Sequence, residues 1–186
     1  ILTHCFRPAP NAPVDTHGKV LPALREARGR GVLFDIGHGM GAFGFASADA
    51  ALADGFAPDI ISSDVHSLSV NGPAYDLLHT MSKLLNCGVG LADVLRMATD
   101  APARALRRLD LGHLAPGAPA DLSVLRVAEV ALPFVDALGV RRDGMRLLRP
   151  VGLLRAGVWS DAVARMWEER GAPAQDAASA NSAGRP

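Results

Sequence analysis

Short apolar runs alternate with helical stretches through the first half of the chain, and this alternation constrains the fold most strongly. Buried strands are predicted at 1–6, 32–36 and 58–64. Helices are predicted at 20–30, 47–55 and from Pro73 to about Cys87. Strands that alternate with helices form parallel sheets, because the helix returns the chain to the starting end of the sheet. The sequence therefore predicts an α/β fold whose strand ends share one face.

The character of the sequence changes near Gly112. Residues 113–170 combine turn residues with alternating apolar positions, which predicts a small β-rich flanking domain that ends in a helix. Residues 171–186 are rich in Ala, Ser, Gly and Pro and almost lack large apolar side chains, so we expect a disordered tail. The predicted organisation is an α/β domain at 1–112, the flanking β domain at 113–170 and the tail.

Composition argues against several classes of function. The 19 basic and 19 acidic residues give a net charge of +0, and aromatic residues make up only 5%, which argues against nucleic-acid binding. No apolar run reaches the roughly eighteen residues of a membrane span. Cys5 and Cys87 are interpreted as reduced thiols, which favours a cytoplasmic protein. We expect a small-molecule substrate as the partner and leave assembly into a homo-oligomer open.

Residues of the kind that bind metals follow each predicted strand. His4 follows the first, His38 lies between two glycines in "GVLFDIGHG", and Asp64 ends the third. Ends of parallel strands meet on one face, where the catalytic groups of barrels collect. Imidazole nitrogens and carboxylate oxygens are usual zinc ligands. A single histidine at a strand end is more often a turn residue, and Asp64 could cap the next segment, so both interpretations stay open.

Several segments resemble the amidohydrolase superfamily. They are "THCF", "LFDIGHGMGAFGF", "GFAPDIISSDVH", "NGPAYDL", "MSKLL" and "ATDAPARALRRLDLGHLAPGAPADLSVL". The resemblance covers about residues 1–125 and is greatest to the amidohydrolase/deacetylase metallohydrolases, which are related to dihydroorotases. It implies the C-terminal portion of a (β/α)8 TIM-type barrel with a small flanking β domain.

The resemblance also implies roles for single residues. His4 and His38 match the histidines that end strands five and six and bind one divalent ion. Asp64 matches the aspartate after strand eight, which contacts a second ion and acts as the acid/base. The implied cofactors are two zinc ions in the intact protein.

The remaining ligands of the family are a His-x-His pair and a carboxylated lysine, and both would precede Ile1. We therefore expect this sequence to be the C-terminal part of a longer protein and to be inactive by itself. Lys19 and Lys83 are interpreted as solvated or structural residues, not as substitute ligands.

The implied function is metal-dependent hydrolysis of an amide or ester, with N- or O-acyl deacetylation expected. Bound metal lowers the pKa of water, and Asp64 would carry the proton to the leaving group. His66, Asn71 and Gly72 are candidate substrate contacts, with an ordinary loop as the alternative. Two other functions stay open: a cyclic-amide hydrolase of dihydroorotase type, with Arg7 as a cation for a ring carboxylate, and a truncated chain without catalysis.

Overall fold

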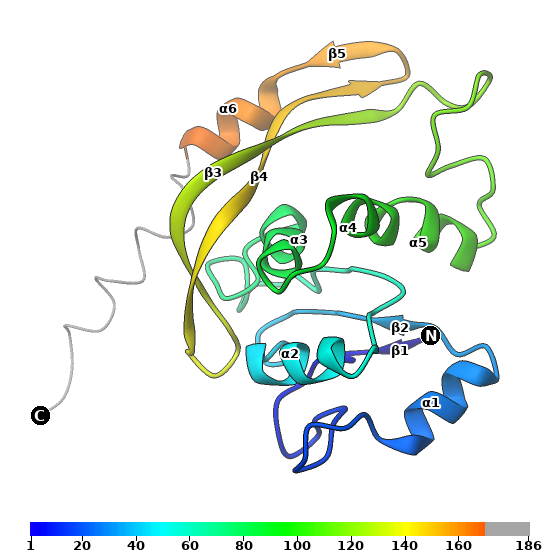
Figure 1. Cartoon of the computed structure of the whole chain (residues 1–186). Coiled ribbons are helices and arrows are strands. Elements are labelled where there is room, and N and C mark those ends of the chain that lie inside the picture. The colour runs from blue at the N-terminus through cyan, green and yellow to red at the C-terminus, as the bar shows by residue number, and fades with distance from the viewer. Residues whose placement is uncertain (170–186) are drawn as a thin grey trace, which may run out of the picture.

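The computed structural model describes residues 1–169, so the predicted tail at 171–186 lies outside the described residues. Figure 1 shows a mixed α/β arrangement in which a long hairpin runs beside the helices. Its elements are β1 (Leu2–Thr3), α1 (Pro22–Gly29), β2 (Phe34–Asp35), α2 (Phe45–Ala53), α3 (Leu77–Asn86), α4 (Leu91–Ala98), α5 (Asp100–Ala105), β3 (Leu122–Val135), β4 (Arg141–Arg155), β5 (Val158–Ser160) and α6 (Ala162–Glu169). The predicted α/β class is confirmed. None of the helices within 1–169 has the length and apolar character to cross a membrane.

The three segments predicted as strands lie side by side in parallel. β1 pairs with β2, with Leu2 opposite Phe34, and Asp35 of β2 bridges Ile60 of the third segment. Three further backbone N–H groups, those of Ile36, His38 and Gly39, donate to carbonyls of residues 60, 62 and 63. The regular ladder is short, and the third segment is extended backbone with one bridge. The order still places His4, His38 and Asp64 at the same end.

Two helix starts differ from the sequence prediction. α2 begins at Phe45 after Gly44, and Ser47, where the helix was predicted to start, is buried inside it, where its hydroxyl donates to the carbonyl of Arg7. α3 begins at Leu77, not at Pro73, because the Asp76 carboxylate accepts the N–H of His79 and caps the helix there.

One hydrophobic core joins the parallel segments to the β3–β4 hairpin. Phe6, Phe34 and Leu84 of the first part belong to the same buried cluster as Phe134 and Leu147 of the hairpin. β3, β4 and β5 form an antiparallel sheet that packs through β4 against α3 and α6. The described residues thus form one packed unit around α3, and the domain boundary at Gly112 stays a prediction.

Candidate metal site at the strand ends

The ring of His4, directly after β1, is oriented by one backbone contact. Its Nδ1 donates to the carbonyl oxygen of Gly37 at 2.6 Å, so Nε2 keeps its lone pair. This is the usual way in which a metal-binding imidazole is held, through its other nitrogen. Within residues 1–169 no group is hydrogen-bonded to Nε2, so His4 can offer it to a ligand.

Asp64 is exposed, and its carboxylate has no hydrogen-bond or ion-pair partner among residues 1–169. A Cβ built on Gly39 would lie 2.5 Å from its Oδ2, and a Cβ built on Gly37 would lie 2.7 Å from Nδ1 of His4. Only His38 separates these two glycines. The side chains of His4 and Asp64 therefore lie against one short turn, on the same face.

The backbone of both residues is strained. His4 has a φ of 70° and Asp64 a φ of 47°, in the left-handed region that costs a residue with a Cβ about 1–2 kcal/mol. Such conformations persist where the surrounding structure enforces them, and they cluster at ligand and active sites. Residues elsewhere in the described chain share this conformation, namely Tyr75, Arg107 and Ala156. Strain therefore supports a role for His4 and Asp64 but does not define it.

His38 faces the interior instead. Its ring is 0% exposed and stacks on Phe43 with 5.0 Å between ring centroids. Its Nδ1 lies 3.0 Å from the carbonyl of Gly39, and its Nε2 lies 2.7 Å from Nζ of Lys83. Burial and the Lys83 charge lower the pKa of His38 to about 3, so the ring is neutral near pH 7. Both nitrogens have protein partners among the described residues, and the role of His38 as a metal ligand stays a prediction.

Lys83 is fully buried. The sequence left open whether its side chain is solvated or structural, and burial excludes the solvated alternative. Its Nζ lies 2.7 Å from the carbonyl of Pro73 and 2.6 Å from that of Val135, besides His38. Three acceptors match the three protons of an ammonium group. Burial lowers the pKa of Lys83 to about 7, while the buried carboxylate of Asp136 acts in the opposite direction. Lys19, by contrast, is exposed and pairs with Asp54.

The loop after Asp64 folds back on itself. The backbone N–H of His66 donates to the hydroxyl of Ser69, which in turn donates to the carbonyl of Asp64. His66 and Asn71 are exposed, and Gly72 has a φ of 122°. These contacts place the three predicted substrate residues on the loop that leaves Asp64 but assign them no ligand, so their role stays a prediction.

The residues present fit part of a metal centre. Residues 1–169 contain no cluster of three or more His, Cys, Asp or Glu side chains that could hold a metal ion. His4 and Asp64 offer two ligands, whereas zinc sites use three or four protein ligands. The free Nε2 of His4 and the unpaired carboxylate of Asp64 are suitable donors for such an ion.

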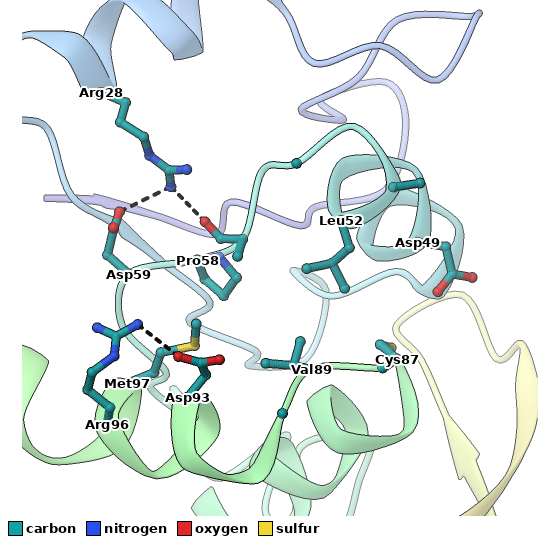
Figure 2. A pocket seen from close by; sticks show the side chains of 15 residues that line it. Arg28, Asp49, Leu52, Pro58, Asp59, Cys87, Val89, Asp93, Arg96 and Met97 are labelled. Atoms are coloured by element: carbon teal, nitrogen blue, oxygen red, sulfur yellow. Dashed lines mark hydrogen bonds and ion pairs between the residues drawn. The ribbon is translucent and has the colours of Figure 1, made fainter.

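A surface hollow of about 730 Å³ lies at the opposite ends of the strands (Figure 2). Pro58 and Asp59, which line it, precede the segment whose far end carries Asp64. Its charged groups are paired, Arg28 with Asp59 at 3.1 Å and Arg96 with Asp93 at 3.5 Å. The hollow is therefore separate from the candidate metal site.

Comparison with known proteins gives a family match. The model of the amidohydrolase family matches residues 40–147. A deacetylase of Enterococcus faecalis is 33% identical over 159 residues, which are 84% of this chain and 43% of that protein. A deacetylase of Agrobacterium fabrum is 34% identical over 151 residues, 81% of this chain and 37% of that protein. The chain thus spans less than half the length of these curated relatives.

Two solved structures share the fold at the same level of identity. An adenine deaminase superposes with a TM-score of 0.82 and 33% identity, covering 86% of this chain and 44% of that one. A dihydroorotase superposes with a TM-score of 0.74 and 33% identity, covering 86% and 43%. At this coverage the likeness includes part of the β3–β5 sheet as well as the parallel segments.

Proposed function

Because the chain belongs to the amidohydrolase family, we propose that it carries part of the active face of a metal-dependent hydrolase that cleaves an amide or ester. The proposed reaction is N- or O-acyl deacetylation, and the curated relatives bear the name deacetylase. The observation that carries the proposal is His4, whose Nδ1 is bound to Gly37 and whose Nε2 is free beside the turn that also borders Asp64.

The proposed fold of the whole protein is a (β/α)8 barrel, of which β1, β2 and the segment at 60–63 are neighbouring strands. Since this segment pairs directly with β2, it is the next strand after the one that carries His38, and not strand eight beside strand six as the resemblance implied. Their parallel order and the residues at their shared end support this assignment. In such a barrel the active face is the one to which the strand ends point, and this is the face of His4 and Asp64.

In the proposed mechanism each residue acts through a stated atom. His4 binds metal through Nε2, while the Gly37 carbonyl keeps the ring in place. Asp64 accepts a proton from the attacking water and returns it to the departing nitrogen or oxygen. The divalent metal, proposed to be two zinc ions in the whole protein, would supply an acidified water and a Lewis acid for the substrate carbonyl. His66, Asn71 and Gly72 are proposed to contact the substrate from the loop after Asp64.

A cyclic-amide hydrolase of dihydroorotase type is the second candidate, and Arg7 favours it. Arg7 follows His4 closely, is exposed, and its guanidinium has no hydrogen-bond or ion-pair partner within 1–169. A guanidinium there could pair with a substrate carboxylate. For the isolated 186 residues we propose a third outcome, no catalysis, because the described part offers only two metal ligands.

The test is hydrolysis by the complete gene product loaded with zinc. Substrates are N-acyl amino acids, acyl esters and a cyclic amide that bears a carboxylate, and the variants are Asp64→Asn and the exposed-lysine control Lys19→Met. We expect Asp64→Asn to lower kcat by about 100-fold or more, since a general acid/base contributes about that factor. Full activity of Asp64→Asn on every substrate would overturn the proposal.

A further inference from the structure

The loop that follows Asp64 is closed around a buried serine. Ser69 is 0% exposed, and its carbonyl accepts the N–H groups of Gly72 at 3.2 Å and of Tyr75 at 3.0 Å. Its own N–H donates to the carbonyl of His66 at 2.9 Å, and its hydroxyl lies 3.4 Å from the carbonyl of Asp64. The loop from Asp64 to Tyr75 is therefore one folded unit, and it carries the three proposed substrate contacts.

Asp76 ends this loop, and its two carboxylate oxygens have different partners. Oδ1 accepts the N–H of His79 at 2.7 Å and so caps α3. Oδ2 accepts the indole N–H of Trp167 at 3.3 Å, from a residue of α6 that lies 91 positions later in the chain. Because Asp76 directly follows Tyr75, its carboxylate joins the end of the loop to α3 and to α6.

The indole of Trp167 is supported from β4. The guanidinium of Arg149 on β4 lies 5.3 Å from the centroid of the indole, within the range of a cation–π contact. β4 packs against both α3 and α6, and a groove of about 310 Å³ lies between the two helices beside the indole. Within residues 1–169 the bond to Asp76 is the only hydrogen bond from α6 to a residue before β3. It is thus the polar contact that connects α6 to the loop.

We propose that Trp167 is a positioning residue: by binding Asp76 from α6, it fixes the end of the loop that follows Asp64 and so orients the substrate contacts on that loop. This inference rests on the proposed function for the role of those contacts. Without the indole N–H, only the α3 cap would hold the end of the loop. Substrate binding would then have to order the loop, and this cost weakens binding. Asp64 lies at the other end of the loop, so proton transfer should change less than substrate binding.

The chain has two tryptophans, so the contact can be observed directly by ¹H–¹⁵N NMR of the 186-residue protein. We expect the indole N–H of Trp167 to exchange with solvent more slowly than that of Trp159, which is 51% exposed. Trp167→Phe keeps an aromatic ring on α6 but removes the donor. In this variant the amides of Gly72 and Tyr75 should exchange about 2- to 10-fold faster, the range that corresponds to one hydrogen bond. The amide of Leu84, inside α3, should keep its wild-type rate.

Two further variants separate positioning from general destabilisation. Trp159→Phe removes the other indole and should leave the exchange rates of the loop unchanged. Asp76→Ser keeps a hydroxyl that can cap α3 but removes the second oxygen, so it should reproduce the effect of Trp167→Phe and replaces that variant if it does not fold. The inference is overturned if the folded variants keep the wild-type rates in the loop, or if Trp159→Phe or the amide of Leu84 shows the same acceleration.

Kinetics of the complete gene product loaded with zinc provide the second measurement. Trp167→Phe should raise KM by about 2- to 10-fold, because one hydrogen bond that orders the loop is lost, while kcat stays near the wild-type value. A lower kcat with an unchanged KM would overturn the assigned role. If the wild-type product hydrolyses none of the substrates, the proposed function fails, whereas the exchange rates still decide whether Trp167 fixes the loop.

Discussion

Nδ1 of His4 lies 2.6 Å from the carbonyl oxygen of Gly37, and this contact leaves Nε2 as the ring nitrogen open to a metal. The same turn borders Asp64 through Gly39. The geometry of one three-residue turn therefore controls both groups to which we assign chemistry. Small changes in this turn should affect the site more strongly than they affect the fold.

Gly37→Ala should disturb His4. The added Cβ would lie 2.7 Å from Nδ1 and would collide with Cγ2 of Thr3, at a residue whose φ is 49°. We expect kcat/KM of the complete gene product to fall by at least about tenfold, since displaced positioning groups commonly cost more. The control is Gly41→Ala, where a Cβ meets no atom within 4 Å and which should keep wild-type activity. Equal activity of the two variants would contradict the assigned role of the turn.

Gly39→Ala should act on Asp64 instead. Its Cβ would lie 2.5 Å from Oδ2, so the carboxylate must move. Because Asp64 is assigned to proton transfer, kcat should fall more than KM rises. A steady-state assay of Gly39→Ala and Gly41→Ala checks this, and a pure KM effect would argue that Asp64 binds substrate without transferring a proton.

Acidification should destabilise the fold through its buried histidines. Burial and Lys83 lower the pKa of His38 to about 3, against an ordinary value of 6.5, and burial lowers the pKa of His79 in the same way. Between these values the unfolded chain binds more protons than the folded chain, so stability rises with pH and is lost as the pH falls from 6.5 toward 3. The loss should be on the order of a few kcal/mol.

Urea unfolding at pH 7 and pH 4.5 measures this loss. His38→Gln should show a smaller difference between the two pH values than wild type, because Gln does not titrate. An identical difference in both proteins would show that other groups cause the acid sensitivity.

His79→Leu should stabilise the protein. His79 is 3% exposed and lies between Tyr75 and Phe134, and within residues 1–169 neither of its ring nitrogens has a hydrogen-bond partner. Replacing an unpaired buried polar group with an apolar one of similar size should raise the free energy of unfolding by about 1 kcal/mol. The exposed His17→Leu should leave it unchanged. A lower melting temperature for His79→Leu than for wild type would contradict this prediction.

The sequence predicts the parallel arrangement and the placement of His4 and Asp64 because both depend on local patterns, strand alternation and strand ends. It does not reveal the orientation of His38. A histidine between two glycines has the same local sequence whether its ring points outward or inward. The inward orientation of the ring depends on its contacts with Lys83, 45 residues later, and with Phe43.

One feature of the sequence does indicate that Lys83 is buried. Lysine is among the residues least often buried, so an isolated lysine on a helix is interpreted as solvated. However, α3 carries a single charged residue in Leu77–Asn86, and a helix with so few charges around its circumference is typical of burial. The short β ladders depend on tertiary contacts that local propensity does not encode. The start of α3 at Leu77, by contrast, follows from the local cap by Asp76.

A Co²⁺ titration of the 186-residue protein followed by NMR tests the central claim, that His4 and Asp64 face a divalent metal, most directly. Paramagnetic Co²⁺ broadens signals of the groups nearest to it, and the method detects weak binding by two ligands. We expect the signals of the His4 ring and of the Asp64 carboxylate to broaden first. Broadening that singles out neither His4 nor Asp64 would contradict the account.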